Sequence, residues 1–334
     1  MILVTGSTGL VGGHLLWHLL QENDRVAAIR RPSSNLEPLR SIFSFYTSSP
    51  DDFLSRIDWK IGDVLDKETL SKSMHNITRV YHCAAVVSLG NNIEVMSDTN
   101  VNGTRNIVQA SLENNIEKFC FVSSIAAFGR ASAGNEIDEN CVWTDSPVRS
   151  PYSRSKYYSE QEVWKGIRDG LNAVIVNPGV ILGVSGTDTG SSQLFALVQK
   201  GLIFYTSGGT GYVDVKDVTK AMIQLMQSEI SGERFILVGE NCSNKDILSW
   251  MADGFGKRRP FIGIGEGLFW TAGLLSELLG KLFRFCPLID RGTARSTTHR
   301  EFYSSLKIKS ALGFSFTPVE QCIREVCKFR TKKY

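Results

Sequence analysis

Met1-Ile-Leu-Val-Thr-Gly-Ser-Thr-Gly-Leu-Val-Gly-Gly-His14 is the stretch that decides the fold, because an apolar strand runs directly into regularly spaced glycines and then into an amphipathic helix. Gly6 allows a sharp turn, Gly9 allows the backbone to approach a pyrophosphate, and Gly12 allows the helix to lie against the sheet. The phosphates would meet free N–H groups at the helix N-terminus. The stretch therefore predicts a dinucleotide site, made by Gly6, Thr8, Gly9, Leu10, Val11 and Gly12.

A second glycine-rich stretch, Gly263-Ile-Gly265-Glu-Gly267, lacks this context because no long strand precedes it. A turn without a ligand is the better interpretation there. Only the first cluster is predicted to bind a dinucleotide.

Apolar runs alternate with helix-like segments from the first stretch to about residue 180. The runs lie at residues 25–29, 59–62, 80–87, 119–122 and 173–176, and the helical patterns lie at 102–112 and 152–167, with a polar excursion over 32–58. Such alternation is typical of an α/β protein with a parallel, doubly wound sheet.

The pattern loosens after Pro178 and ends in a mostly helical region. We expect residues 1–180, joined again by 212–240, to form a Rossmann dinucleotide-binding domain, and residues 181–211 and 241–334 to form a smaller substrate-binding part. A ligand would lie between them, at the carboxyl ends of the strands. The loops at 87–92, 130–146 and 182–205 and the C-terminal region would line the substrate pocket, and their apolar content slightly favours a lipophilic substrate without selecting one.

Charge and cysteine content argue against several classes of protein. The 37 Lys and Arg against 34 Asp and Glu leave a net charge of +3, and the basic C-terminal end, residues 328–333, is expected to be solvated rather than to bind nucleic acid.

The seven cysteines form no Cys-x-x-Cys pair, and His14 and His18 lack the Glu of a zinc-protease helix, so no metal is predicted. A reducing cytoplasm is expected, since Met1 opens directly into the first strand and leaves no room for a signal peptide.

The longest apolar region runs from Phe261 to Ile289 but contains four charged residues, which argues against a transmembrane span. Its leucines favour an amphipathic helix that packs on its own domain or on a partner subunit. A membrane-surface role for this helix is the alternative.

Tyr152 and Lys156 have the i,i+4 spacing that puts both side chains on one face of a helix. A phenol has a pKa of about 10, and a nearby ammonium lowers it, so the pair suits acid–base chemistry. The same spacing occurs at Tyr212/Lys216 and Tyr303/Lys307, which we expect to be surface coincidences. Only Tyr152 follows a strand that ends in two hydroxyl side chains, Ser123-Ser124.

Further motifs follow along residues 1–239. Together they are Thr5-Gly-x-x-Gly-x-x-Gly12, Asp63-Val64, His82-Cys-Ala-Ala85, Asn100-Val-Asn-Gly-Thr104, Val122-Ser-Ser124, Tyr152-x-x-x-Lys156, Asn177-Pro-Gly179 and Tyr212-Val-Asp-Val-Lys-Asp217. In their order and spacing the chain resembles the extended short-chain dehydrogenases/reductases, and within them the NAD-dependent epimerase/dehydratase group, near dihydroflavonol reductases and 3β-hydroxysteroid dehydrogenases. Gly183-Val184 departs from the family's common Gly-Pro, which leaves the substrate group open.

The resemblance implies a role for each matching residue. Tyr152 would be the proton donor or acceptor at the substrate oxygen, Lys156 would bind nicotinamide-ribose hydroxyls and tune Tyr152, and Ser124 would hydrogen-bond the reacting group. Asn102 would support the lysine, with a helix N-cap as an equally open alternative. Further cofactor contacts are implied for Asp63, Val64, Ala84, Ala85, Val86, Asn177, Pro178, Gly179 and Val180.

The choice of cofactor depends on Arg30-Arg31 at the end of the second strand. An acidic residue there would accept the ribose 2′-OH of NAD, whereas guanidinium groups suit the 2′-phosphate of NADP. The sequence therefore favours NADP over NAD; the alternative is that both arginines only solvate a loop.

An NADP(H)-dependent oxidoreductase acting on a carbonyl or secondary alcohol is the leading hypothesis. A nucleotide-sugar epimerase or dehydratase is the second, for which Arg291, Arg295 and Arg300 could bind a diphosphate. A regulatory protein that binds NADP(H) without turnover is the third, and the intact Ser124, Tyr152 and Lys156 argue against it. The resemblance also implies a homodimer through the helices near 103–115 and 152–168.

Overall fold

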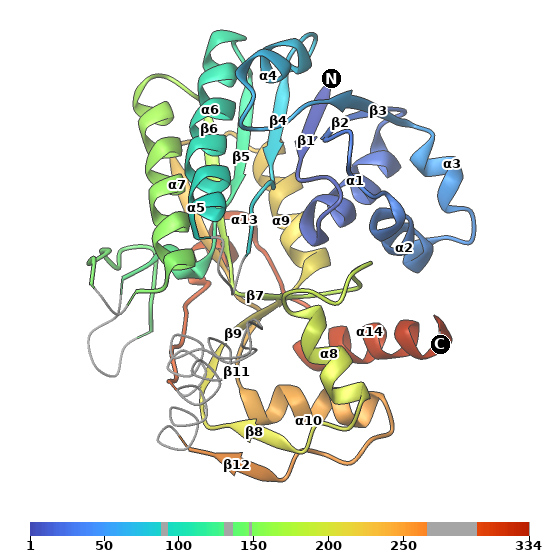
Figure 1. Ribbon diagram of the computed structural model, residues 1–334. Helices are drawn as coiled ribbons and strands as arrows, with labels where there is room; N and C mark the ends of the chain where they lie inside the picture. The colour runs from blue at the N-terminus through green and yellow to red at the C-terminus, as the bar shows by residue number, and fades with distance from the viewer. Residues whose placement is uncertain (88–92, 130–135, 147–148, 266–298, 334) are drawn as a thin grey trace, which may run out of the picture.

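The computed structural model describes residues 1–87, 93–129, 136–146, 149–265 and 299–333. Its centre is a seven-stranded sheet in the order β10-β6-β5-β4-β1-β2-β3, with every neighbouring pair parallel (Figure 1). The strands are β1 (Ile2–Thr5), β2 (Val26–Arg30), β3 (Ile57–Ile61), β4 (Arg79–His82), β5 (Lys118–Val122), β6 (Ala173–Pro178) and β10 (Glu233–Leu237). The predicted doubly wound parallel sheet is confirmed.

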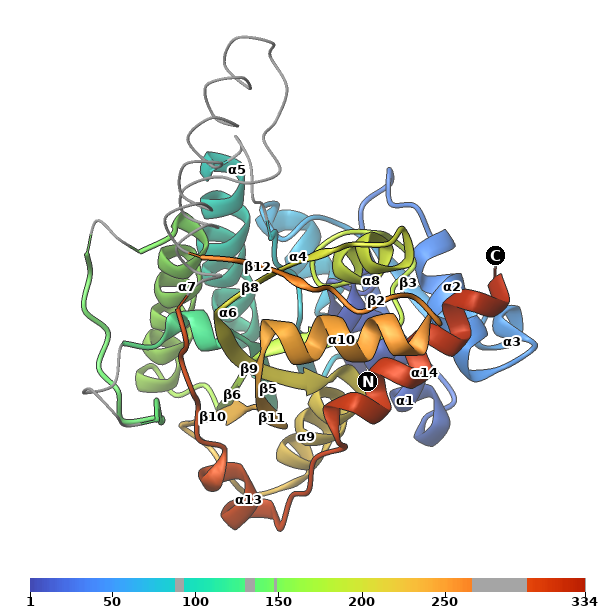
Figure 2. The same cartoon turned by 90° about the horizontal axis from the view of Figure 1, so that it is seen from below.

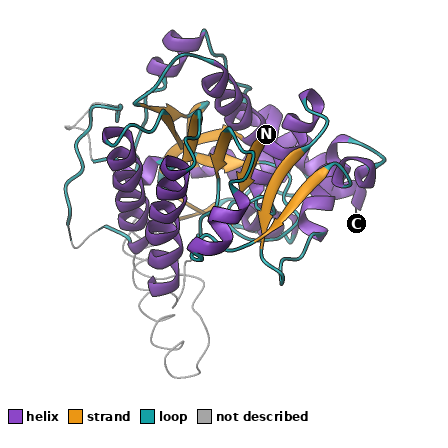
Figure 3. Ribbon diagram, turned by 90° about the horizontal axis from the view of Figure 1, so that it is seen from above, coloured by secondary structure: helices purple, strands orange, loops and turns teal. Residues whose placement is uncertain are grey.

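Helices cover both faces of this sheet, as Figure 3 shows from above. On one face lie α1 (Leu10–Glu22), α2 (Glu37–Tyr46) and α9 (Val215–Gln227); on the other lie α4 (Lys67–Ser73), α6 (Gly103–Glu113) and α7 (Pro151–Arg168). In β5, Cys120 and Val122 are buried against the first layer, whereas Phe119 and Phe121 are buried against the second. Burial on both faces explains why the strand is a continuous apolar run rather than an alternating one.

The predicted polar excursion at residues 32–58 contains two helices, α2 and α3 (Pro50–Leu54). Leu39, Ile42 and Phe43 recur at helical spacing and are buried beside α1, where Ile42 lies close to Gly13. The aromatic and aliphatic residues of this segment therefore form part of the core, which the surrounding polar residues concealed in the sequence.

β4 ends at His82 and not at residue 87 as predicted, because the next backbone groups have other partners. The Asn100 amide accepts from Val86 N at 2.7 Å and donates to Val86 O at 3.0 Å, so this segment cannot continue the ladder. Asn100 lies in a π-helical turn (Asp98–Asn102) between α5 (Ile93–Ser97) and α6. A short 3₁₀ turn, Ile125–Ala127, follows β5.

A second part of the molecule lies below the carboxyl ends of the central strands (Figures 1 and 2). It contains a sheet in the order β11-β9-β7 and a parallel pair of β12 and β8, packed with three helices among the described residues. The strands are β7 (Val180–Leu182), β8 (Phe204–Thr206), β9 (Gly209–Asp214), β11 (Glu240–Ser243) and β12 (Ile262–Ile264), and the helices are α8 (Ser192–Gln199), α10 (Asn244–Gly254) and α14 (Val319–Lys333). A further helix, α13 (Leu306–Leu312), packs instead against β10 of the central sheet, where Ile308 is buried. After β9, the chain returns through α9 to the central sheet at β10, before it enters β11.

Two expectations for the C-terminal region change. Gly263 in β12 pairs with Tyr205 in β8, so the start of the predicted helix at 261–289 is a strand, and Gly263 lies in this strand rather than in a turn. The rest of the predicted helix and of the second glycine-rich stretch, from residue 266 on, lies outside the described residues. The basic C-terminal end is not wholly solvated, since Arg330 on α14 donates to Asp188 at 2.8 Å and to Ser192 at 3.1 Å. Its side chain is 11% exposed. These bonds tie α14 to the loop before α8.

Candidate active site

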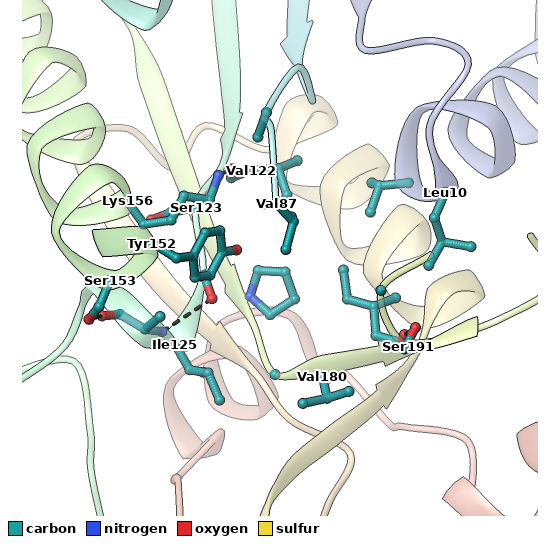
Figure 4. A pocket seen from close by; sticks show the side chains of 18 of the residues that line it. Leu10, Val87, Val122, Ser123, Ile125, Tyr152, Ser153, Lys156, Val180 and Ser191 are labelled. Atoms are coloured by element: carbon teal, nitrogen blue, oxygen red, sulfur yellow. Dashed lines mark hydrogen bonds between the residues drawn. The ribbon is translucent and has the colours of Figure 1, made fainter. Parts of the chain in front are cut away.

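A cavity of about 720 Å³ opens at the carboxyl ends of the central strands, between the two parts of the chain. Its walls come from the glycine stretch, the segment after β4, the end of β5, the start of α7, the β6–β7 connection, the loop before α8 and residues 299–303. Figure 4 shows Tyr152 and Lys156 entering from α7, opposite Leu10 of α1, with Val180 and Ser191 along the side. The predicted position for a ligand and this cavity coincide.

The glycine stretch forms one end of the cavity, and Gly6, Thr8, Gly9, Leu10, Val11 and Gly12 all line it. Gly6 has φ +66°, and a Cβ there would lie 2.5 Å from Ala84 N. A Cβ on Gly12 would lie 2.2 Å from Gly6 O, so α1 packs directly onto the turn. Gly9 immediately precedes α1 and has more space, with Gly6 O at 3.3 Å from its ideal Cβ. The result is a bare helix N-terminus facing the cavity.

Tyr152 lies at the start of α7, where Ser150 caps the helix by accepting from Ser153 N at 3.1 Å and Pro151 occupies the first turn. Burial raises the pKa of Tyr152, while a hydrogen bond from the Ser124 hydroxyl lowers it. The phenol is therefore protonated at neutral pH. Ser124 follows β5, and its Oγ also accepts from Ala126 N at 3.1 Å. The geometry brings a proton donor and a hydroxyl together in the cavity wall.

Lys156 also lines the cavity, but its side chain is almost fully buried. Nζ donates to Val122 O at 2.8 Å and lies 5.2 Å from the ring centroid of Phe121. Burial lowers the pKa of Lys156 to about 8, although Glu160 and Cys83 oppose this shift. The expected lowering of the Tyr152 pKa by Lys156 is not the interaction found here, because the ammonium is directed to β5 and the Ser124 hydroxyl is the group that lowers that pKa.

Glu160 is a buried carboxylate beneath the cavity that the sequence reasoning missed. It lies one helical turn after Lys156, and its oxygens accept from Ser123 Oγ at 2.7 Å and Asn177 Nδ2 at 2.8 Å. They also accept from Trp164 Nε1 at 3.2 Å and Arg234 at 3.0 Å. In the sequence, Tyr152, Lys156 and Glu160 follow one another at four-residue intervals and therefore share one helix face. This spacing is the signal that could have identified Glu160 as buried.

Asn102 does not have the position that the motif suggested, and Asn100 lies closer to the cavity wall. Asn102 lies on the outer side of the helix, where its amide donates to Asp98 at 2.9 Å and accepts from Arg105 at 2.9 Å, and its side chain makes no cap. Asn100 is buried and donates to Ser155 Oγ at 3.0 Å besides bonding Val86. Asn100, not Asn102, therefore links the cavity wall after β4 to the helix that carries Lys156.

The other implied cofactor residues divide into two groups. Ala85, Pro178, Gly179 and Val180 line the cavity together with the glycine stretch, Ser124, Tyr152 and Lys156. The remaining residues lie behind the cavity and support its walls. Asp63 accepts from Leu65 N at 3.0 Å, and Val64 packs on Gly103. Ala84 N donates to Thr5 Oγ1 at 3.3 Å, Val86 N donates to the Asn100 amide, and Asn177 donates to Ser124 O at 3.1 Å.

Arg30 and Arg31 lie at the end of β2, outside the walls of the cavity. The Arg30 guanidinium lies 5.6 Å from the ring centroid of Trp59 in β3. Its Nε is buried and has no hydrogen-bond partner among the described residues. Arg31 is exposed, with its backbone N donating to Ser34 Oγ at 3.0 Å. A buried donor without a partner is costly, and it suits an acceptor supplied by a ligand.

The far end of the cavity is lined by Arg149, His299, Glu301 and Tyr303. His299, Glu301 and Tyr303 alternate along an extended segment held by Gly209 N to His299 O at 3.1 Å and Ile137 N to Phe302 O at 2.8 Å. Alternation in an extended chain directs these three side chains to one side. Tyr303 donates to Glu301 Oε2 at 3.0 Å, and burial raises its pKa.

Neither of the other two tyrosine–lysine pairs is a surface coincidence. Tyr303 lines the cavity, and Lys307 pairs with Glu233 outside it. Tyr212 is buried and donates to Asn244 Oδ1 at 3.0 Å, while Lys216 pairs with Asp214 and Glu325. Shared spacing therefore gives three different environments, and of the three tyrosines only Tyr152 has a buried lysine one turn later.

Among the described residues, no group of three or more His, Cys, Asp or Glu side chains is placed to hold a metal ion. Nor does any helix in the described part of the chain have the length and apolar character needed to cross a membrane.

Comparisons with known proteins agree with this geometry. A sequence model of the NAD-dependent epimerase/dehydratase family matches residues 2–239. A Synechocystis sp. protein provisionally named dihydroflavonol 4-reductase is 29% identical over 96% of this chain and 92% of its own length. Cinnamoyl-CoA reductase 1 from Petunia hybrida is 24% identical, covering 100% of this chain and 92% of its own.

Solved structures have the same fold. The crystal structure of gox2253 has a TM-score of 0.82 at 29% identity, covering 100% of this chain and 98% of that one. UDP-glucose 4-epimerase from Thermus thermophilus, solved with NAD, has a TM-score of 0.74 at 20% identity, covering 98% of each chain.

Proposed function

Because this chain belongs to the NAD-dependent epimerase/dehydratase family, whose members are NAD(P)-dependent enzymes of the extended short-chain dehydrogenase/reductase type, we propose that it is an NADP(H)-dependent oxidoreductase. It reduces a carbonyl, or oxidises a secondary alcohol, of a small molecule. The observation that carries the proposal is the cavity shared by the glycine stretch, Ser124, Tyr152 and Lys156.

The residues present fit a dinucleotide. Side chains at Gly6 and Gly12 would collide with backbone, and the positions that face the cavity before α1 carry no bulky group. The N–H groups at the start of this helix would hold the pyrophosphate. Pro178, Gly179 and Val180 would lie beside the nicotinamide, and Asp63 and Val64 near the adenine.

Preference for NADP is supported by Arg30. Its buried Nε lacks an acceptor within the described residues, and the guanidinium is fixed by Trp59 near the end of β2. A 2′-phosphate would supply the missing acceptor through a charge-assisted hydrogen bond. Arg31, exposed beside it, would add a second positive charge.

The chemistry of reduction assigns one role to each residue. When bound, the nicotinamide supplies the hydride to the carbonyl carbon. Tyr152, protonated because burial raises its pKa, donates its proton to the carbonyl oxygen, and the Ser124 hydroxyl hydrogen-bonds that oxygen and then the phenolate. Lys156, whose ammonium lies in the cavity wall and donates to Val122 O, would bind ribose hydroxyls of the cofactor. Oxidation of an alcohol would follow the same path in reverse.

The substrate end of the cavity combines apolar and polar groups. Val87, Ile125, Phe128 and Ile181 give it apolar walls, and Arg149, His299, Glu301 and Tyr303 provide polar contacts at the far end. We therefore propose a largely apolar substrate that carries a second polar group distant from its reacting oxygen.

Epimerisation or dehydration of a nucleotide sugar is the alternative, and it needs cations for a diphosphate. Of the candidates from the sequence, Arg291 and Arg295 lie outside the described residues, and Arg300 donates to Ser207 O at 3.2 Å. Arg149 is a cation that does line the far end of the cavity. The same tyrosine would serve that reaction.

A homodimer through α6 and α7 is also proposed. Tyr158 on α7 is 45% exposed, and Val95 on α5 is 52% exposed. Burial of such side chains would favour association. A monomeric mass in solution scattering would contradict it.

The test of the proposed function is titration of the purified protein with NADPH and NADH, followed by a panel of carbonyl substrates read by loss of nicotinamide absorbance. Tighter binding of NADPH together with net oxidation supports the reductase. Binding without net oxidation supports the epimerase or a protein that binds without turnover, and binding of neither cofactor contradicts the proposal.

A further inference from the structure

Glu160 lies below the cavity, where three separate segments of the central sheet meet. It is 1% exposed, and its carboxylate accepts from Ser123 after β5, Asn177 at the end of β6 and Arg234 in β10. Four donors surround the two carboxylate oxygens, so the group is held in one orientation. A buried carboxylate with this many partners is a rigid centre from which neighbouring segments take their positions.

Asn177 extends this network to the reacting groups. Its Nδ2 donates both to Glu160 at 2.8 Å and to Ser124 O at 3.1 Å. Both neighbours are acceptors, so only the NH₂ side of the amide can face them, and the side chain cannot flip. The backbone of Ser124 is thereby fixed with respect to α7, the helix that carries Tyr152 and Lys156.

We propose that Glu160 is a positioning residue for the reaction: through Asn177 it fixes the backbone of Ser124 relative to α7, and it places a carboxylate one helical turn from Lys156. The proposal rests on the proposed function for its catalytic consequence. Its effect on Lys156 concerns cofactor binding alone and can be tested without a substrate.

The charged and titratable groups around Lys156 make the electrostatic effect specific. On α7 they are Glu160 and Tyr152; after β4 they are Cys83 and the buried, neutral His82. Glu160 is the largest influence that opposes the burial of the ammonium. Arg234, which faces Glu160 from β10, donates to Glu139 O at 2.7 Å as well, and this divides its charge between two acceptors.

The expected pH dependence follows from these signs. With a pKa of about 8, Lys156 loses its proton as pH rises through that value, so the affinity for NADPH should fall above pH 8. Removing the Glu160 charge removes a contribution that raises this pKa, so the fall should begin at a lower pH. A role confined to structure would weaken binding equally at every pH.

The experiment compares the full-length wild type with Glu160→Gln and with the control Glu162→Gln. Glu162 lies on the same helix, α7, but its carboxylate pairs with Arg105 of α6. NADPH affinity is measured by fluorescence titration from about pH 6.5 to about pH 9.5, a range that brackets the expected midpoint. Glu160→Gln is expected to lower the midpoint of the fall by about one pH unit and turnover by about tenfold, while Glu162→Gln changes neither. An unchanged midpoint in folded Glu160→Gln overturns the proposal.

If Glu160→Gln does not fold, the double variant Glu160→Gln/Arg234→Met replaces the buried ion pair with neutral side chains, which proteins often tolerate. The same downward shift of the midpoint is expected, and its absence overturns the proposal. A wild type that binds NADPH with this midpoint but reduces no carbonyl contradicts the proposed function alone.

Discussion

The two ends of the cavity are built in different ways. The end proposed to hold the cofactor's pyrophosphate is one continuous stretch, Gly6 to Gly12, in which backbone groups and the absence of side chains shape the wall. The substrate end joins Arg149, Glu301 and Tyr303 from segments far apart in the chain, and it depends on side-chain contacts. A local site of the first kind can be recognised in a sequence, whereas a site assembled from distant segments exists only after folding.

The largest effect is expected at the junction of the two ends, where Tyr152→Phe removes the proton donor. Turnover should fall about 10²–10⁴-fold, because a positioned general acid contributes that much, while NADPH affinity stays within about threefold of wild type. Steady-state kinetics with a reducible carbonyl and a separate cofactor titration measure the two effects. Tyr212→Phe, which removes another buried hydroxyl followed by a lysine, should leave turnover unchanged. Equal turnover in wild type and Tyr152→Phe would refute the mechanism.

Gly12→Ala should break the cofactor end alone. The new Cβ would lie 2.2 Å from Gly6 O, so α1 must move away from the turn. We expect a loss of about 1–3 kcal/mol in the free energy of unfolding and a loss of about 10–100-fold in NADPH affinity. Gly9→Ala, with 3.3 Å available, should cost less stability. Denaturant unfolding and cofactor titration give the values, and an equal loss of stability in both variants would contradict the packing argument.

Arg30→Asp should change the preference of the cofactor end without damaging it. Loss of a charge-assisted hydrogen bond to the 2′-phosphate should lower the affinity for NADPH about 10–100-fold. The affinity for NADH should stay within about threefold of wild type, and separate titrations with the two cofactors would measure both values. Arg25→Asp makes the same charge change at the other end of β2, at an exposed side chain, and should affect neither cofactor. If NADH and NADPH weaken equally in Arg30→Asp, the arginine is not a phosphate ligand.

Glu301→Gln should affect the substrate end of the cavity only. It removes the negative acceptor of Tyr303 at the far end of the cavity, so KM for a substrate with a distal polar group should change about 3–10-fold in steady-state kinetics. The affinity for NADPH should not change. Glu320→Gln, at a surface pair with Arg324 on α14, is the control. A change in NADPH affinity instead of KM would place Glu301 at the wrong end.

The fold was largely predictable, because burial on both faces of a parallel sheet forces continuous apolar runs such as Phe119–Val122. The prediction failed where side chains replace backbone pairing. β4 stops early because Asn100 takes the backbone groups of Val86, and residues 32–58 contain helices whose few apolar residues are separated by polar ones. The first effect leaves no periodic signal, whereas in the second Leu39, Ile42 and Phe43 do recur at helical spacing, within an otherwise polar segment.

For the candidate site, the sequence indicated Tyr152 and Lys156, which both line the cavity, but not their surroundings. It suggested that Lys156 lowers the pKa of Tyr152, whereas the Ser124 hydroxyl has that position and Lys156 bonds Val122 O. Glu160 was overlooked because a single glutamate on a helix is usually solvated. Only the approach of β5, β6 and β10 makes it a buried centre.

The sheet, the glycine turn and the spacing of Tyr152 and Lys156 could all be inferred from the order of residues, because each follows from local conformation: apolar runs, glycine at a positive φ and one helical turn. Which groups meet in and below the cavity depends on the tertiary structure. It brought Ser124, Asn177 and Glu160 into one network and placed His299, Glu301 and Tyr303 at the far end of the cavity. The physical reason is that hydrogen bonds and desolvation depend on distances between segments, which the order of residues does not encode locally.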